Sequence, residues 1–170
     1  MKILAIDPGN VESAYVVWNG KKVLAKGKEE NQHFLWHTLH EYSCTCKLTV
    51  IEQIKSYGMA VGDTIFDTVF WTGRFFHEVE RWGGMAHRFP RMDVKMHLCH
   101  TTRAKDGNVI QALVDRFAKD TPNKGKGSKK NPGFFYGFKS DIWQAFALAV
   151  TYYDRLNMVE ETKSETDIFA

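Results

Sequence analysis

The feature that most constrains this chain is an apolar run that ends in an acid and a turn, residues 3–9 (Ile-Leu-Ala-Ile-Asp-Pro-Gly). A run of this length and character is typical of a buried strand, and Pro-Gly is a turn signal. Residues 48–53 (Leu-Thr-Val-Ile-Glu-Gln) repeat the pattern and place Glu52 at the end of a second strand. Because a carboxylate is rarely buried unless it is paired or binds a metal, these two acids favour a divalent-metal site.

Length and composition indicate one folded domain. The 170 residues are enough for one sizeable core and few for two. No apolar stretch is long enough to span a membrane, and the early Asp7 does not fit a signal peptide, so we expect a cytoplasmic protein. Three cysteines argue against a disulfide framework, and Cys44 and Cys46 lack the second pair that a structural zinc site needs.

Charge is distributed unevenly, although the net charge is only +3. Residues 119–139 contain six lysines and one acid, whereas residues 159–170 contain four acids and one lysine. A basic loop points to a polyanion partner, and a solvated connector is the alternative interpretation. We therefore expect a domain over residues 1–158, with a basic loop at 119–139, and a flexible acidic tail over 159–170.

Hydrophobic periodicity predicts an alternating α/β order. Strands are expected over 2–7, 13–18, 21–26, 47–53 and 94–99, with Asn19-Gly20 as a hairpin turn. Helices are expected over 31–42, 63–82, 106–118 and 140–156. In the last helix we expect Ser140 as the N-cap, Asp141 in the first turn, and fraying beyond Asn157. This order predicts a mixed sheet flanked by helices.

A third acid, Asp141, is expected at the start of the last helix, and Gln144 shares its helix face. Three acids near the ends of central elements can hold Mg²⁺, and two such ions about 4 Å apart support phosphodiester hydrolysis. Each acid also has an ordinary interpretation: a turn cap for Asp7, a surface strand residue for Glu52, and a helix-dipole residue for Asp141. Their coincidence with a basic loop favours the metal site.

With these motifs the sequence resembles the RuvC-like Holliday-junction resolvases, in the compact version often encoded by bacteriophages. The resemblance rests on the family's three acid motifs in the family's order, at residues 6–9 (Ile-Asp-Pro-Gly), 51–53 (Ile-Glu-Gln) and 140–151 (Ser-Asp-Ile-Trp-Gln-Ala-Phe-Ala-Leu-Ala-Val-Thr). Residues 104–108 (Ala-Lys-Asp-Gly-Asn) resemble the family's Lys/Asp-containing helix start. The similarity spans roughly residues 1–155.

The resemblance implies an α/β, RNase H-like fold: a mixed central sheet with an order-reversed edge strand, flanked by helices. It implies a homodimer that nicks a four-way DNA junction symmetrically, with Asp7, Glu52 and Asp141 as the catalytic acids. The implied cofactor is Mg²⁺, with two ions per site and Mn²⁺ as a substitute, and no small organic cofactor. Bacterial members usually have Asp where this chain has Gln144, whose amide oxygen is a weaker metal ligand. Either Asp141 then takes the final ligand role with Gln144 in support, which we favour, or a nearby acid such as Asp106 is a supporting acid.

Contacts to DNA are predicted more loosely. The candidates for phosphate contact are Lys55, Arg103, Lys105, Lys124, Lys126, Lys129, Lys130 and Lys139. Tyr57 is a candidate to stack on an unpaired base, and packing beneath its own loop is an equal alternative. Helix 63–82 has more aromatic residues than one buried face needs, which suits a core and, in part, a dimer interface. His97 and His100 lack metal-site spacing, and we expect structural roles for them.

We expect hydrolysis by direct attack of metal-bound water, because no serine, tyrosine or cysteine lies in a recognisable nucleophile motif. Three alternatives remain open. One is a less selective nuclease of the same fold, acting on forks, flaps or RNA–DNA hybrids. The second is a branched-DNA-binding protein that has lost turnover because of Gln144. The third is an actin-like phosphotransferase fragment, against which the missing second phosphate-binding loop argues.

Overall fold

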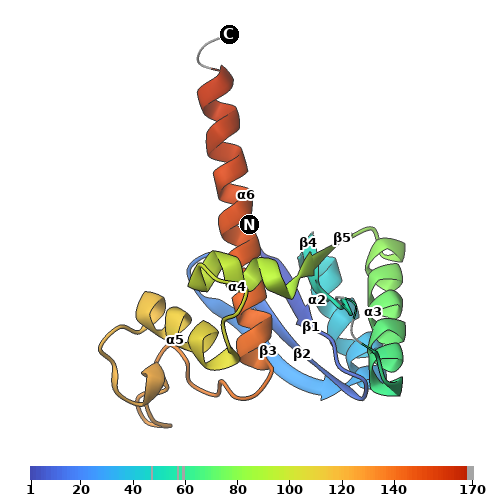
Figure 1. Ribbon diagram of the computed structural model, residues 1–170, viewed down its shortest axis with the longest axis horizontal. Coiled ribbons are helices and arrows are strands. Elements are labelled where there is room, and N and C mark those ends of the chain that lie inside the picture. Colours follow the sequence, from blue (N-terminus) through green and yellow to red (C-terminus); the bar gives the residue numbers. More distant parts are fainter. Residues whose placement is uncertain (47, 57, 59, 168–170) are drawn as a thin grey trace.

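The computed structural model describes residues 1–46, 48–56, 58 and 60–167. Its centre is a five-stranded sheet in the order β3-β2-β1-β4-β5 (Figure 1). The strands are β1 (Ile3–Asp7), β2 (Glu12–Trp18), β3 (Val23–Glu30), β4 (Leu48–Gln53) and β5 (Met85–Pro90). Pairing is antiparallel for β1–β2 and β2–β3 and parallel for β1–β4 and β4–β5. This is the expected mixed sheet, with the first three strands in reversed order and β3 at one edge.

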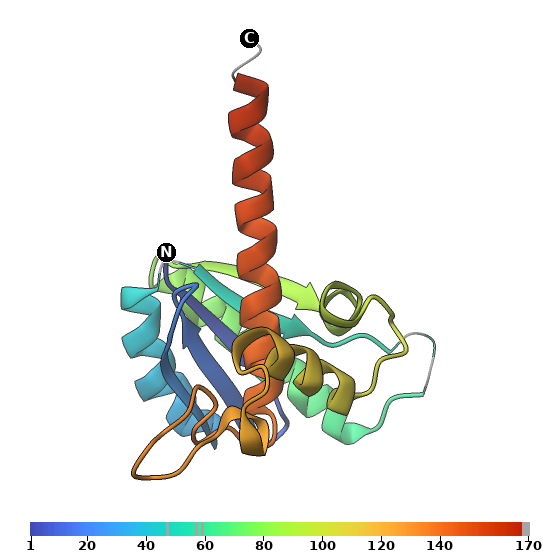
Figure 2. The ribbon, with the colours of Figure 1, turned by 90° about the vertical axis from the view of Figure 1, so that its left-hand side faces the viewer.

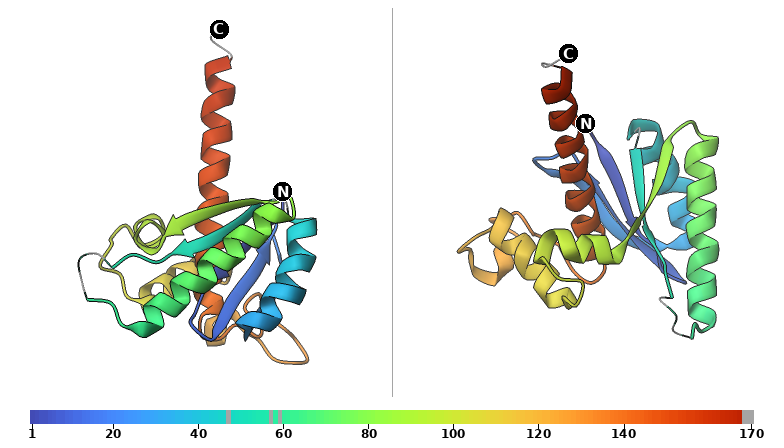
Figure 3. Two further views of the ribbon diagram at one scale, coloured as in Figure 1. Left: turned by 90° about the vertical axis from the view of Figure 1, so that its right-hand side faces the viewer. Right: turned by 45° about the horizontal axis from the view of Figure 1, so that its top comes forward.

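Helices cover both faces of this sheet (Figure 3). One face packs against a helical segment made of α1 (Asn31–His33), the π-helical η1 (Phe34–Leu39) and α2 (His40–Thr45), and against α3 (Asp63–Arg81). The other face packs against α4 (Arg91–Cys99), α5 (Asp106–Phe117) and α6 (Ile142–Asp167). Within the described part of the chain, no helix is both long and apolar enough to cross a membrane.

The alternation of side chains along β1 explains why there are two cores. Ile3 and Ala5 point into the core beneath α6, whereas Leu4 and Ile6 point into the core beneath α3, and all four are fully buried. The same rule sends Asp7 to the α6 face, because it follows Ala5 by two residues. A strand that is buried on both faces has a continuous run of apolar residues, and the acid at its end, Asp7, therefore stands out in the sequence.

The region after α3 differs from the prediction. Residues 94–99 were expected to form a strand, but they belong to α4, and the fifth strand is β5 instead. Val94, Met96 and Leu98 alternate as in a strand, yet Val94 and Leu98 are also four residues apart, and both pack into the core beneath α6. Pro90 is the N-cap of α4, a position where its missing N–H costs nothing.

The last helix also differs at both ends. Ser140 has a left-handed backbone (φ 44°) and is not the N-cap. Instead Asp141 precedes α6, and its carbonyl accepts hydrogen bonds from the N–H groups of Gln144 and Ala145 (2.9 and 3.0 Å). The helix continues to Asp167 and projects beyond the sheet (Figure 2), so the expected fraying after Asn157 is wrong. Residues 158–167 lack glycine and proline, which permits this extension. The division into a 1–158 domain and an acidic tail stays a prediction.

The basic loop at 119–139 is largely irregular, as expected, with one short 3₁₀ turn, η2 (Pro122–Gly125), and one isolated bridge between Gly127 and Pro132. It is nevertheless anchored to the core. Phe135 and Phe138 are buried, and their rings lie 4.5 and 5.0 Å from the ring of Trp143 in α6. Aromatic packing of this kind fixes the base of the loop and leaves its lysine-rich part at the surface.

Candidate active site

The two strand acids lie side by side at one edge of the sheet. Ile6 of β1 pairs with Ile51 of β4 in parallel register, so Asp7 and Glu52 follow at equivalent positions. Leu48, Val50 and Glu52 are two residues apart along β4, so their side chains point to the same face of the sheet. Leu48 and Val50 lie in the core beneath α6, and Glu52 therefore points to the same face as Asp7. Its side chain is almost entirely buried, with the whole residue 6% exposed. Neighbouring parallel strands therefore deliver two carboxylates to one place.

A cavity of about 290 Å³ opens beside these strand ends. It is lined by Asp7, Pro8, Gly9, Glu12, Arg91, Asp106, Asp141 and Gln144. The predicted acids Asp7 and Asp141, the predicted amide Gln144 and the supporting Asp106 therefore come together from β1, α5 and α6. The remaining predicted acid, Glu52, lies next to the cavity rather than on its wall.

The turn after β1 is held by a buried polar network. The Ser13 hydroxyl donates to Asn31 Oδ1 (2.6 Å), and Asn31 Nδ2 donates to the Gly9 carbonyl (2.9 Å). The Gly9 N–H donates to the Ser13 hydroxyl (3.2 Å). A Cβ at Gly9 would lie 2.3 Å from the Glu12 carbonyl oxygen, so only glycine fits there. This network positions the backbone that carries Asp7.

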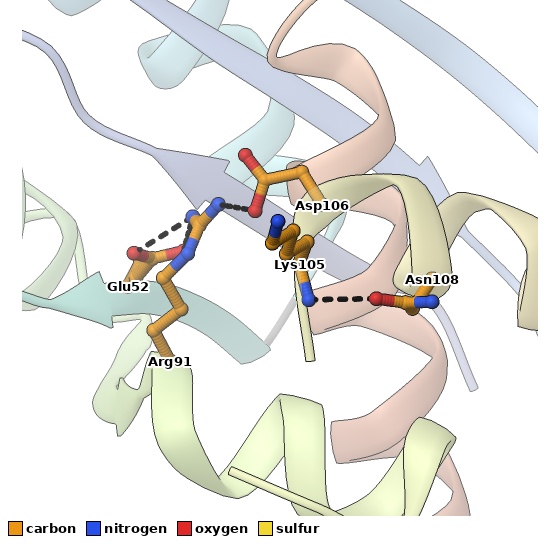
Figure 4. A network of polar contacts seen from close by, with 5 residues as sticks. All are labelled: Glu52, Arg91, Lys105, Asp106 and Asn108. Atoms are coloured by element: carbon orange, nitrogen blue, oxygen red, sulfur yellow. Dashed lines mark hydrogen bonds and ion pairs between the residues drawn. The ribbon is translucent and has the colours of Figure 1, made fainter. Parts of the chain in front are cut away.

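Arg91, the first residue of α4, lies between Glu52 and Asp106 and pairs with both of them (Figure 4). Its Nη1 donates to both carboxylate oxygens of Glu52 (3.2 and 3.1 Å), and its Nη2 donates to Asp106 Oδ1 (2.8 Å). Burial acts to lower the pKa of the guanidinium, but the charges of Glu52 and Asp106 outweigh it and the pKa is raised. Arg91 is therefore a permanent cation inside the acidic cluster.

Lys28 of β3 supplies a second cation. Its Nζ lies 2.8 Å from Asp141 Oδ2 and 3.5 Å from Glu12 Oε2. The hydrogen bond to Asp141 raises the pKa of the lysine. The sequence did not single out Lys28 or Arg91, because each meets its acid only through tertiary structure. In addition, the residues that follow Arg91 were predicted as a strand over 94–99, so the position of Arg91 at the start of α4 was not foreseen.

The pKa values of both strand acids, Asp7 and Glu52, are raised. Burial raises the pKa of the Asp7 carboxyl well above its ordinary value, and the charge of Glu52 raises it further, while Arg91 opposes both. Burial likewise raises the pKa of Glu52, against the lowering effect of Arg91. Asp7 is half-buried and makes no side-chain hydrogen bond or ion pair within the described chain, so this carboxylate has no partner there.

The residues fit a hard divalent cation in their chemistry. Asp7, Asp106, Asp141 and the Gln144 amide present oxygen donors to one cavity, and oxygen is the donor that Mg²⁺ prefers. The unpaired Asp7 carboxylate is the group that most needs such an ion. As the described residues stand, no three His, Cys, Asp or Glu side chains are grouped closely enough to hold one. Glu52 is bound to Arg91 and Asp141 to Lys28, so these acids are engaged elsewhere.

The predicted DNA-contact residues lie at several places. Lys105 and Arg103 are exposed next to Asp106, where the Lys105 N–H donates to Asn108 Oδ1 (2.9 Å) at the start of α5. Lys55 is exposed just beyond β4. In the basic loop Lys124, Lys129, Lys130 and Lys139 are exposed and Lys126 is half-buried. Tyr57 lies outside the described residues. The two histidines have ordinary settings, with His97 Nε2 2.8 Å from Asp154 Oδ2 and His100 exposed.

A second basic surface was missed by the sequence reasoning. We call it the β3 groove, a cavity of about 490 Å³ between edge strand β3 and the basic loop. It is lined by Lys21, Lys22, Val23, Lys26, Pro132, Gly133, Phe134 and Tyr136. Lys26 lies 5.3 Å from the ring centroid of Phe138 and, two residues along the strand, precedes Lys28 at the acidic cavity. A row of lysines therefore leads from Asp141 towards the loop.

Comparison with known proteins identifies the fold. No family model and no curated protein sequence matches this chain. The solved structure of Thermus thermophilus RuvC aligns with a TM-score of 0.63 and 16% identity, covering 92% of this chain and 97% of that chain. The structure of T. thermophilus RuvC in complex with a Holliday junction substrate aligns with a TM-score of 0.61 and 16% identity, covering 92% and 96%. The chain has the RNase H-like fold that the family resemblance implied.

Proposed function

We propose that this protein is a metal-dependent endodeoxyribonuclease that resolves four-way DNA junctions, nicking them symmetrically as a homodimer. One observation carries the proposal: Asp7 and Glu52 end neighbouring parallel strands on one face, and Asp141 and Gln144 line the cavity beside them. The likeness to a RuvC that was solved with a Holliday junction substrate supports the substrate class. The compact, bacteriophage-type assignment and a cytoplasmic location remain predictions from the sequence.

Asp7, Glu52, Asp141 and the Gln144 amide would hold Mg²⁺, with two ions per site and Mn²⁺ as a substitute. When bound, these ions would supply Lewis acidity and a water nucleophile for phosphodiester hydrolysis. The chain's own part is electrostatic. Burial raises the pKa of Asp7, and the charge of Glu52 raises it further; the charge of a bound cation would oppose both effects and favour the carboxylate form. Before a metal ion binds, Arg91 pairs with Glu52 and Asp106, and Lys28 pairs with Asp141.

The lysine-rich surfaces would hold the DNA. Lys105 and Arg103 lie at the α5 end of the acidic cavity, and the basic loop lies beyond α5 along the chain. The β3 groove adds Lys21, Lys22 and Lys26 to the predicted set. Lysines two residues apart on a strand are about 6.8 Å apart, which is close to the phosphate spacing of a DNA strand. We propose that one strand leaving the acidic cavity follows this row.

The proposed homodimer would use the exposed face of α3. Phe75 is buried in the core, but Phe66 and Phe70 are each 61% exposed, and Val69 between them is exposed as well. Val69 also lines an apolar cavity of about 330 Å³ with Thr72, Gly73, Phe76 and Arg88. An exposed aromatic face of this kind is typical of an interface, and a two-fold dimer matches the symmetry of a four-way junction.

A second candidate function is a branched-DNA-binding protein with weak or no turnover. Two features favour it: Gln144 stands where the family that the sequence resembles usually has Asp, and Glu52 is paired with Arg91. Such a protein would retain the fold and the basic surfaces.

The deciding experiment is cleavage of a labelled four-way junction in Mg²⁺, beside a linear duplex, a fork and an RNA–DNA hybrid of matching sequence. We expect paired, symmetric nicks confined to the junction, and loss of cutting with retained binding in Asp7→Asn. Tight binding without cutting in either Mg²⁺ or Mn²⁺ would establish the binding protein instead. In that event, appearance of nicks in Gln144→Asp would identify the neutral amide as the cause.

A further inference from the structure

Arg91 occupies the position of a cation within the proposed metal site. A planar guanidinium can bind two carboxylates at once, and here one arm takes both oxygens of Glu52 while the other takes Asp106 (Figure 4). Glu52 is almost buried, with its side chain 8% exposed, whereas the Arg91 side chain is 31% exposed and lines the cavity. The arginine therefore reaches inward from the cavity wall to a carboxylate that water barely reaches.

The charges around the cavity show what this contact does. Five carboxylates, those of Asp7, Glu12, Glu52, Asp106 and Asp141, lie on or beside the cavity, and Arg91 and Lys28 pair with four of them. Without Arg91, Glu52 would be a buried charge next to the half-buried acid Asp7, an arrangement that folded proteins tolerate poorly. With Arg91 in place, both Glu52 oxygens accept a hydrogen bond from its Nη1, and a divalent ion that binds Glu52 has to compete with the guanidinium charge. The same contact therefore compensates the charge of Glu52 in the metal-free protein and competes with a metal ion for this carboxylate.

We propose that Arg91 is a resident cation that holds Glu52 until a divalent ion replaces it, so that metal binding here exchanges an arginine for an ion. This inference rests on the proposed function in one respect, that Glu52 is a metal ligand. Once released from Glu52, Arg91 stands at the cavity wall with its charge available to a phosphate of the bound strand. DNA and metal then favour each other's binding, because a phosphate that pairs with Arg91 frees Glu52 for the metal, and a metal on Glu52 frees Arg91 for the phosphate.

The test is calorimetric titration of Mn²⁺ into the protein without DNA. We expect the Kd for Mn²⁺ to fall about ten-fold or more in Arg91→Gln, because the ion no longer competes with a buried ion pair. Arg91→Lys should lie between the two, since lysine keeps the charge but cannot bind Glu52 and Asp106 together. Arg81→Gln is the matched control. It removes an arginine that pairs with Glu78 (2.7 Å) on the surface of α3, and its Kd should equal that of the wild type.

Thermal unfolding provides a second readout that needs no activity. In EDTA the Tm of Arg91→Gln should fall by several degrees, and Mn²⁺ should raise it by more than it raises the wild-type Tm. If Arg91→Gln does not fold in EDTA, Arg91→Lys gives the same comparison. An unchanged or higher Kd in both Arg91 variants would overturn the exchange and show that Arg91 positions Glu52 for the ion.

The outcomes separate this inference from the proposed function. Junction cleavage by the wild type with an unchanged Kd in the Arg91 variants overturns the exchange alone. A lowered Kd in Arg91→Gln without junction cleavage by the wild type supports the exchange and overturns the nuclease. If the wild type, Arg91→Gln and Arg91→Lys all fail to bind Mn²⁺, the exchange is overturned, and so is the metal dependence of the proposed reaction.

Discussion

At the scale of the residue, the acids of the cavity differ in how well their charges are compensated. Asp7 is the extreme case, because it ends a strand buried on both faces and makes no side-chain hydrogen bond or ion pair within the described chain. Its neighbour Glu52 is relieved by Arg91, and Asp141 is relieved by Lys28. Asp7 therefore stores the unfavourable energy that a bound cation would remove, which makes it the residue whose neutralisation is most informative.

Neutralising this carboxylate should stabilise the metal-free protein. The folded-state pKa of Asp7 is raised above its unfolded value, chiefly by burial and then by Glu52, so the folded protein binds more protons between the two values and stability falls as pH rises through that window. We expect Asp7→Asn in EDTA to be more stable than the wild type by about 1–2 kcal/mol at neutral pH. The difference should shrink towards pH 4, as followed by urea unfolding. Lower stability of Asp7→Asn at every pH would contradict this account.

At the scale of the element, the short turn between β1 and β2 decides where Asp7 points. Asn31, at the start of α1, is fully buried and joins Ser13 of β2 to the Gly9 carbonyl. The turn is thus fastened to a helix on the opposite face of the sheet from α6. A loop without this support would leave the acid free to move away from Glu52, so the geometry of the site depends on a residue outside the cavity.

Removal of the Asn31 amide should therefore weaken both the fold and the site. Asn31→Ala leaves the Ser13 hydroxyl and the Gly9 carbonyl without their partner, and we expect a loss of about 1–3 kcal/mol in the free energy of unfolding. Junction cleavage should fall as well, because Asp7 loses its positioning. Asn157→Ala in α6 is the matched control and should change neither quantity. Unfolding curves of both variants would test this, and equal stability would show that water replaces the amide.

At the scale of the whole molecule, the exposed face of α3 and the β3 groove lie on different parts of the surface. The first contains Phe66 and Phe70, and the second contains Lys22 and Lys26. β5 lies at one edge of the sheet and β3 at the other, and α3 contacts β5. A partner copy on α3 would therefore leave the β3 groove available for DNA, so the two surfaces can be altered independently.

The dimer is tested by removing aromatic area from α3. Phe66→Ser combined with Phe70→Ser should weaken self-association by about 100-fold or more, because each buried phenyl ring contributes roughly 1.5–3 kcal/mol. Trp36→Ser, which changes an exposed aromatic residue on η1, is the control. Sedimentation equilibrium measures the effect. Equal masses for the double variant and the wild type would exclude this face as the interface.

The β3 groove is tested by charge reversal. Lys22→Glu combined with Lys26→Glu should weaken junction binding by about ten-fold near 0.1 M salt and reduce the magnitude of the salt-dependence slope by about 2. Lys2→Glu, at the opposite end of β1 from Asp7, should have little effect. Fluorescence anisotropy over a range of salt concentrations provides both quantities. An unchanged slope in the double variant would place the DNA elsewhere.

The sequence predicted the strand acids because a buried strand leaves an unmistakable apolar run before each of them. It also predicted the mixed sheet, which depends on the order of such runs. It misplaced α4, because Val94, Met96 and Leu98 satisfy the strand period while Val94 and Leu98 satisfy the helix period. Arg91 and Lys28 left no local signal, because their acids are distant along the chain and meet them only once the sheet and helices are assembled.

The open edge of β3 has a consequence for solubility. A strand at the edge of a sheet offers unpaired N–H and C=O groups to any other extended chain, and proteins commonly protect such edges with lysine. Along β3, Lys26 and Lys28 occupy this role, next to the anchored loop that closes over one end of the strand. The same lysines that we assign to DNA therefore also keep copies of the protein from joining edge to edge into aggregates.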